Sequence, residues 1–397
     1  MKCSSNWCTS APSSTRSDRG QSLMKTSFDV IVIGAGVMGA SIAAALVENG
    51  LDVALIEKGV AGAQGATRDT GGIVRGLELD PALRPLTSHR PQDDSTGIVH
   101  SLFAQALKRT GVAYIASSDV CGQYLDAVGS EGTQNVELHA SVGPLDNGRF
   151  SALCPQECLL IERNGGIVDA RVAVANLCRY VREKATFIDH LAVDHCRDGG
   201  GQVQVFAGPL CLTATWAVDA SGANGPLARP QGAVHARTIP FTRMGCDQSP
   251  SMPVIAHHLN TYLLPLGRSV MQVGGQRRQR AGHADQLNLA SLDNEQDVVE
   301  RVARLGYDAH HCWPLVTQVG WDAYTDDGRP LIGRFSDDSH LYLATGFCGI
   351  GFKMAPNVAE RLAYELSSLM AGVTLDKSHC STMQAFCPSR FTEVALS

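Results

Sequence analysis

The sequence predicts a mixed fold, α/β together with α+β, in which a helix-flanked parallel sheet is combined with a second region of short strands. Three observations support this prediction. A strand, glycine turn, helix and second strand follow one another over residues 28–57. Helical and apolar strand patterns then recur along the chain. Finally, residues 111–149 alternate short apolar segments with Gly, Asp and Asn turns, and residues 226–320 contain further strand-like runs.

The first unit is Rossmann-like. Phe28–Ile33 is a short, β-branched apolar run that is typical of a buried parallel strand. Val37–Asn49 predicts an alanine-rich helix ended by Gly50, and Leu51–Glu57 predicts a second strand. The stretch Val30–Val47 carries no charge, but three glycines interrupt it and a strand and a helix share it. We therefore expect no membrane span there.

Periodicity places the remaining elements. Asp169–Lys184 predicts an amphipathic helix in which Val172, Ala175, Leu177 and Val181 share one face. The other expected elements are a helix at Leu102–Arg109, a strand at Cys211–Val218, a polar helix at Gln286–Leu305, a strand at Leu341–Ala344 and a helix at Ala355–Met370.

The last helix and the first residues of the chain have contrasting patterns. Pro356 suits the first turn of the last helix, and its apolar stripe consists of Val358, Leu362 and Leu366. Residues 1–26 are rich in Ser and Thr and almost free of aliphatic side chains, which predicts a disordered tail. A transit peptide is the weaker alternative, because basic residues are few.

Composition excludes several classes of function. The chain of 397 residues is 44% hydrophobic and 18% charged, and its net charge of −6 argues against a nucleic-acid or anionic-membrane partner. The 13 cysteines lack zinc-site spacing, so we expect free thiols and a cytoplasmic location. His257-His258 and His310-His311 are adjacent pairs rather than i, i+4 pairs, so we expect no metal site.

The glycine turn has the spacing of a dinucleotide-binding motif. Gly34 permits the tight turn, Gly36 permits close approach of a pyrophosphate, and Gly39 permits close packing of helix on strand. An acid at the end of the second strand accepts ribose hydroxyls and repels a 2′-phosphate, which favours FAD or NAD over NADP. The expected cofactor contacts in this unit are Gly34, Gly36, Val37, Met38, Gly39, Glu57 and Lys58.

Three further segments favour FAD over NAD: residues 65–72 (GATRDTGG), 216–222 (WAVDASG) and 345–353 (TGFCGIGFK). Residues 326–333 (DDGRPLIG) add a fourth motif to the resemblance. With them the chain resembles the FAD-dependent amine oxidoreductases of the D-amino-acid oxidase superfamily. Within that superfamily it is most similar to the group of monomeric sarcosine oxidase, pipecolate oxidase and glycine oxidase. The resemblance covers roughly residues 28–370 and is thin between 80 and 150.

The resemblance implies a Rossmann-like FAD-binding domain with an interleaved antiparallel-sheet substrate domain. The first would comprise residues 28–80, 150–226 and 322–397, and the second would comprise 81–149 and 227–321. The further cofactor contacts that it implies are Thr67, Arg68, Gly71, Gly72, Ala220, Gly222, Gly346, Gly349, Ile350, Gly351, Phe352 and Lys353.

Two cations match the residues that hold the substrate carboxylate in the sarcosine oxidase group. They are Arg75, after the early glycine loop, and Lys353, at the end of the GFCGIGFK segment. A planar guanidinium fits a carboxylate bidentately, and an ammonium adds a compact charge. The alternatives are a surface or flavin-phosphate arginine and a lysine that merely begins a helix. Tyr262 and Tyr324 are candidates for the pocket wall.

Other positions depart from that group. Gln272 stands where the resemblance implies a lysine that promotes reaction with oxygen, and a neutral amide does not supply that positive charge. The segment Gly320–Asp322 has no cysteine where the group tethers its flavin, which implies non-covalent FAD. Cys348 lies within the expected flavin loop, where we interpret it as a packing residue.

The implied reaction is oxidation of an amino acid or secondary amine that carries a carboxylate. Arg75 and Lys353 would hold the carboxylate, hydride would pass from carbon to flavin N5, and an imine would result, with oxygen or another electron acceptor regenerating the flavin. Amides at Gly349–Gly351 would stabilise negative charge on the reduced flavin. Three alternatives stay open: a 2-hydroxy-acid dehydrogenase, a tailoring flavoenzyme of specialised metabolism, and a non-catalytic flavin subunit of a complex.

Overall fold

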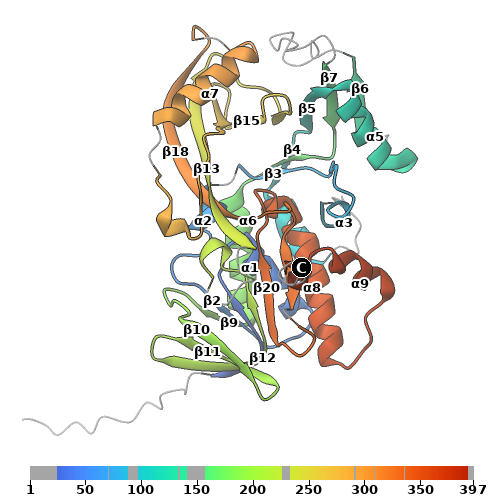
Figure 1. The fold of residues 1–397 in the computed structure, drawn as a ribbon, viewed down its shortest axis with the longest axis vertical. Coiled ribbons are helices and arrows are strands. Elements are labelled where there is room, and N and C mark those ends of the chain that lie inside the picture. Colours follow the sequence, from blue (N-terminus) through green and yellow to red (C-terminus); the bar gives the residue numbers. More distant parts are fainter. Residues whose placement is uncertain are drawn as a thin grey trace, which may run out of the picture.

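The computed structural model describes residues 25–69, 71–87, 97–132, 135–140, 157–225, 233–289, 292–307, 309–334 and 336–391. Figure 1 shows two main sheets, one in the lower half of the view with α1 and α8 and one in the upper half with α7. The tail predicted at residues 1–26 lies outside the described residues, apart from its last two.

The first sheet has eight strands and is built on the predicted unit. Four of its pairings are parallel (β1–β2, β1–β12, β2–β9 and β12–β20), and three are antiparallel (β10–β11, β11–β12 and β19–β20). The fold therefore has the predicted α/β component. Its strands are β1 (Ser27–Ile33), β2 (Val53–Ile56), β9 (Thr186–Ile188), β10 (His195–Gly199), β11 (Gln202–Ala207), β12 (Leu210–Asp219), β19 (Leu331–Arg334) and β20 (Leu341–Thr345).

Four helices pack together against this sheet and enclose the largest apolar core. They are α1 (Val37–Glu48), α4 (Ile98–Ala106), α6 (Ala170–Lys184) and α8 (Gly351–Met370). The uncharged stretch 30–47 is divided between β1 and α1, as expected. Within the described part of the chain, every helix is too short or too polar to span a bilayer.

The second sheet has nine strands and is almost entirely antiparallel, with one parallel pairing between β5 and β14. It supplies the predicted α+β component, and α7 packs on β13, β16 and β18. Its strands are β5 (Val112–Ser117), β6 (Val136–His139), β7 (Glu157–Glu162), β13 (Val234–Cys246), β14 (Val254–Ala256), β15 (Thr261–Pro265), β16 (Val270–Gly274), β17 (Arg280–Ala281) and β18 (Cys312–Thr325). Its helices are α5 (Ser118–Gly132) and α7 (Leu292–Arg304).

A small third sheet lies between the other two in Figure 1, in the order β3-β8-β4. Its strands are β3 (Ile73–Val74), β4 (Leu107–Arg109) and β8 (Gly166–Val168). The remaining described elements are α2 (Gly65–Asp69), α3 (Arg84–Thr87), α9 (Lys377–Gln384) and the short 3₁₀ turns η3 (Gly222–Asn224), η4 (Ala284–Gln286) and η5 (Pro388–Phe391).

Three predictions about single elements were wrong in part. The helix expected at Leu102–Arg109 starts earlier, and its last three residues form β4, because they pair with β8. Within 111–140, residues 118–132 are helical rather than extended, and the predicted strands of 141–149 lie outside the described residues. The helix expected at Gln286–Leu305 is preceded by η4 and begins at Leu292.

The face of α6 also differs from the prediction. Leu177 and Val181 are buried, but Val172 is 44% exposed and Ala175 is exposed as well. The side chains that join the core beside them are Ala173, Val174 and Cys178. The predicted start at Asp169 is confirmed, because its carboxylate caps the helix by accepting the N–H groups of Arg171 and Val172.

Candidate active site

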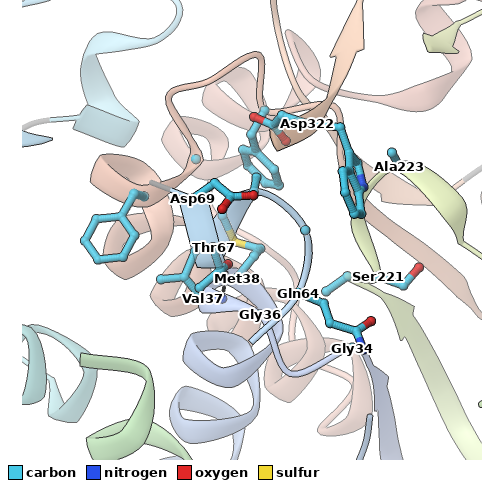
Figure 2. A pocket seen from close by; sticks show the side chains of 18 of the residues that line it. Gly34, Gly36, Val37, Met38, Gln64, Thr67, Asp69, Ser221, Ala223 and Asp322 are labelled. Atoms are coloured by element: carbon cyan, nitrogen blue, oxygen red, sulfur yellow. Dashed lines mark hydrogen bonds between the residues drawn. The ribbon is translucent and has the colours of Figure 1, made fainter. Parts of the chain in front are cut away.

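A cavity of about 420 Å³ lies at the carboxyl ends of β1, β2 and β12 and is lined by residues of all three sheets. Figure 2 shows Val37, Met38 and Thr67 gathered at the start of α1, with Gly34, Gln64 and Ser221 beside them. Asp322 faces them from β18. Crevices at the carboxyl ends of parallel strands are the usual ligand sites of such sheets.

The glycine turn at this edge leaves no room for a Cβ atom at Gly34 or at Gly39. Gly34 has a φ of +98°, and a Cβ there would lie 2.8 Å from Cα of Ser221. A Cβ on Gly39 would lie 1.8 Å from the carbonyl oxygen of Gly34. Glycine is therefore required at both positions, and the close packing of α1 on the turn is the role predicted for Gly39.

The N-terminus of α1 opens onto the cavity without a side-chain cap or an acid in its first turn. The N–H of Val37 donates to Oγ1 of Thr67 at 3.1 Å, which ties the helix start to α2. Glu57 is buried and accepts the N–H groups of Ala35 at 2.7 Å and Gly59 at 2.9 Å. Each carboxylate oxygen keeps a further acceptor position, as ribose recognition requires.

A second helix N-terminus, that of α8, reaches the same cavity. This helix begins at Gly351 rather than at the predicted Ala355, because the left-handed Gly349, with a φ of +80°, turns the chain directly into it. Pro356 consequently lies inside the helix instead of in its first turn, which corrects that prediction. No side chain caps this end and no acid occupies its first turn, so its amides present partial positive charge to the cavity.

Arg75 and Lys353 both line the cavity, although 278 positions separate them in the chain. Arg75 follows β3, donates to the carbonyl of Leu77 at 2.9 Å and lies over the ring of Tyr114. Burial acts to lower the pKa of Arg75, but Tyr114, Tyr124 and Glu78 together raise it above its usual value. Arg75 is therefore cationic at every physiological pH.

Lys353 lies in the first turn of α8 with a side chain only 3% exposed. Its Nζ is 2.9 Å from Oε2 of Glu78. Burial and the neighbouring Arg75 lower the pKa of Lys353 to about 8, although Glu78 opposes them. Burial acts to raise the pKa of Glu78, but Lys353 and Arg75 together hold it below its usual range.

The two residues predicted on the second sheet form one hydrogen-bonded pair. Nε2 of Gln272 donates to the hydroxyl of Tyr262 at 2.9 Å, and Tyr262 lines the cavity. Gln272 does not itself line the cavity, but a Cβ on Gly71 would lie 3.7 Å from its Nε2. The pair therefore lies beside the 65–72 loop that the sequence assigns to the cofactor.

Three other predicted contacts lie near the cavity but do not line it. Arg68 pairs with Asp69 and lies over the ring of Trp321. Gly346 is left-handed, with a φ of +71°, and packs against Thr325. The hydroxyl of Tyr324 lies behind Gly349, 3.1 Å from the position of a Cβ there.

Gly39, also predicted as a cofactor contact, does not line the cavity, because it packs against the Gly34 carbonyl. The remaining cofactor residues named above line the cavity as a group. They are Gly34, Gly36, Val37, Met38, Glu57, Lys58, Thr67, Gly71, Gly72, Ala220, Gly222, Gly349, Ile350, Gly351, Phe352 and Lys353.

Three residues with a place at the site were missed by the sequence analysis. Trp321 and Asp322 line the cavity in the segment that was considered only for its missing cysteine. Asp322 accepts the N–H of Gly349 at 2.9 Å, and burial raises the pKa of its carboxyl to about 6. The acidic residue in Gly320–Asp322 could have been noticed in the sequence. No motif around Glu78 predicts its contact with Lys353.

Cys348 has a φ of +53°, which is unusual for a residue with a side chain. Its Sγ lies 3.4 Å from both N and Oγ1 of Thr325 and 3.1 Å from the carbonyl oxygen of Gly346. These contacts hold the loop from within and agree with a packing role. Ten described cysteines are free thiols, and the described residues contain no group of three or more His, Cys, Asp or Glu side chains able to hold a metal ion.

The lining fits FAD on its own chemistry. Two helix N-termini without a capping N-cap side chain would suit negative charge, that of the pyrophosphate at α1 and that of the reduced flavin at α8. The closely packed turn at Gly34 and Gly39 brings backbone amides next to the cavity, and Glu57 supplies the ribose acceptor.

Comparisons with known proteins agree with this fit. The profile of the family described as "DAO: FAD dependent oxidoreductase" matches residues 29–365. Glycine oxidase of Bacillus licheniformis is 23% identical over 373 residues, which are 86% of this chain and 93% of that protein.

Two solved structures share the fold over most of this chain. The crystal structure of glycine oxidase from Geobacillus kaustophilus has a TM-score of 0.73 at 18% identity and covers 89% of this chain and 99% of its own. That of L-proline dehydrogenase from P. horikoshii has a TM-score of 0.76 at 19% identity and covers 94% and 99%.

Proposed function

The chain belongs to the DAO family of FAD-dependent oxidoreductases, and from this premise we propose that it oxidises an amino acid or a secondary amine that carries a carboxylate. One observation carries the proposal. Arg75 and Lys353, which are far apart in the chain, line the same cavity as the dinucleotide turn and the N-terminus of α8. Two cations beside a redox cofactor are suited to orient an anionic substrate over it.

The names of the relatives support the same class of substrate. One relative is a glycine oxidase and one is an L-proline dehydrogenase, so a primary and a secondary amino acid both occur among proteins of this fold. The two names also differ in electron acceptor, which leaves oxidase and dehydrogenase both within the proposal.

Four side chains at or beside the cavity have distinct parts in the proposed reaction. Bound FAD would supply the acceptor for a hydride from the substrate carbon, which would leave the substrate as a protonated imine. Arg75 and Lys353 hold the substrate carboxylate, Tyr262 forms part of the pocket wall, and Gln272 keeps the Tyr262 hydroxyl in place. The α8 amides favour the negative charge that reduction adds.

The test is an anaerobic titration of the purified holoenzyme with a panel of amino acids and matched 2-hydroxy acids, followed by absorbance. We expect amino acids to bleach the flavin. Bleaching by hydroxy acids alone would contradict amine oxidation and support a 2-hydroxy-acid dehydrogenase, because the same cations suit both substrates.

Arg75→Met tests the carboxylate contact directly. We expect the dissociation constant of the bleaching amino acid to rise about 100-fold or more, because a charge-assisted bidentate contact is lost, while flavin content stays unchanged. The matched control is Arg182→Met, since Arg182 lies on the exposed side of α6, over Phe187. Loss of flavin from Arg75→Met would instead identify Arg75 as a cofactor residue.

A further inference from the structure

Glu78 places a carboxylate against the buried ammonium of Lys353 at the cavity. We propose that Glu78 is a positioning residue that keeps Lys353 protonated and fixed in place, so that the ammonium can receive the carboxylate of the substrate. This inference rests on the proposed function, because it concerns the same carboxylate-binding end of the cavity.

The geometry of the pair supports this role. Oε2 of Glu78 lies 2.9 Å from Nζ of Lys353, and the exposed fractions of the two side chains are 14% and 3%. Lys353 lines the cavity, whereas Glu78 is not among the lining residues. Glu78 therefore approaches the ammonium from outside the lining, and one contact leaves two of the three ammonium hydrogens for other partners.

The segment that carries Glu78 is held by several hydrogen bonds. Glu162 accepts the N–H groups of Gly76 at 2.6 Å and Leu77 at 3.3 Å. Oε1 of Glu78 accepts the N–H of Leu79 at 2.9 Å. Arg84 donates to the carbonyls of Glu78 and Leu79, each at 3.1 Å. These contacts fix both the backbone and the carboxylate, which suits a permanent counter-ion better than a mobile gate.

The charges around Lys353 explain why it needs a counter-ion. Arg75 repels the ammonium, whereas Glu78 and, more weakly, Glu162 stabilise it. On the other elements packed against α8, Arg84 of α3 is directed to carbonyls, and His100 of α4 faces Glu360. Glu78 is thus the charged group in contact with Lys353, and without it burial and Arg75 both favour the neutral amine.

The experiment measures binding of benzoate, a carboxylate without an oxidisable amine, to the holoenzyme through the flavin absorbance between pH 6.5 and 9.5. For the wild type we expect the dissociation constant to rise as the pH passes about 8, where Lys353 loses its proton. Tyr124, with a pKa raised to about 12, stays protonated in this window, whereas Asp322, with a pKa raised to about 6, and His257, with a lowered pKa, titrate mainly below it.

Glu78→Gln keeps the shape of the side chain and removes its charge. We expect binding about threefold weaker at pH 7.5 and a rise that begins about one pH unit lower, because a pKa that falls from about 8 to about 7 lowers the protonated fraction at pH 7.5 about threefold. In Glu78→Gln combined with Lys353→Arg, the rise should disappear, because a guanidinium keeps its proton. Lys353→Met should bind weakly without any such rise.

The matched control is Glu365→Gln on the same helix, which pairs with His379 and Tyr342 and does not line the cavity. It should bind benzoate like the wild type, and thermal melts verify that each variant is folded. Equal or tighter binding by Glu78→Gln, or an unmoved pH dependence, would show that Glu78 does not support Lys353 and would overturn the inference alone. A wild type that binds neither benzoate, butyrate nor acetate would overturn the carboxylate site itself and the inference with it.

Discussion

At the scale of single residues, an amide stands where the resemblance implies a lysine beside the flavin. Gln272 is only 4% exposed, and its amide is committed to the hydroxyl of Tyr262. A neutral side chain in this position gives no electrostatic stabilisation to the negative charge that develops when oxygen takes an electron. From this pair we expect slow reaction with oxygen.

Gln272→Lys is expected to speed reoxidation of the reduced enzyme by oxygen at least tenfold. The new ammonium would lie beside the 65–72 loop, where it can stabilise the developing charge. Stopped-flow mixing of reduced enzyme with oxygenated buffer measures the rate. Gln296→Lys on α7 is the control, because Gln296 is exposed and donates to Glu300 one turn further along the same helix. Equal rates in wild type and Gln272→Lys would show that this position does not govern oxygen reactivity.

At the scale of elements, the contact between the glycine turn and α1 sets the position of the helix N-terminus. The Cβ of any larger residue at Gly39 would overlap the Gly34 carbonyl, so α1 would have to move away from β1. Such a movement would displace the amides that the phosphates require. Fold stability and flavin binding are therefore coupled through one short contact.

Gly39→Ala should cost about 3 kcal/mol or more of unfolding free energy and leave the protein with little bound flavin, because overpacking forces the backbone to shift. Chemical denaturation measures the unfolding free energy. The ratio of absorbance at about 450 and about 280 nm, calibrated against free FAD, measures the bound flavin. The matched control is Gly122→Ala in α5, where a Cβ meets nothing within 4 Å. If Gly39→Ala retained full flavin content at wild-type stability, the close approach at the turn would not be needed for binding.

At the scale of the whole molecule, the cavity brings together residues of all three sheets. Gly34 and Glu57 come from the first sheet, Arg75 follows the third, and Tyr262 and Trp321 come from the second. A ligand in this cavity touches all three sheets at once, so it stabilises the folded state through mass action. From the absence of cysteine at 320–322 we expect this link to be non-covalent.

We expect acid precipitation to release all of the flavin into the supernatant as FAD. Restoring FAD to the apoprotein at 100 times its dissociation constant should stabilise it by about 2.7 kcal/mol, which raises the melting temperature by several degrees. Differential scanning fluorimetry measures the shift, and riboflavin, which lacks the phosphates that α1 binds, serves as the control. Flavin that stays with the precipitated protein would reveal a covalent bond and contradict the prediction.

Elements that are determined by residues near each other in the sequence could be predicted, whereas elements that depend on contacts between distant segments could not. The unit from β1 to β2 and the start of α6 at Asp169 follow from short-range rules of periodicity and glycine conformation, and both were predicted. Helix α5 was missed, because a Gly- and Ser-containing segment has weak helical preference and is stabilised by burial of Cys121 and Tyr124 under β5 and β7. The last three residues of the helix predicted at Leu102–Arg109 became a strand because β8 offered them a partner.

The sequence by itself determined the dinucleotide turn, the acid at Glu57, the membership of the family and the two cations at Arg75 and Lys353. Only the tertiary structure decided that Glu78 lies against Lys353 and that Asp322 reaches the Gly349 amide. The reason is physical: glycine turns and strand–helix units act within a few residues, whereas an ion pair across 275 positions exists only after the sheets have packed.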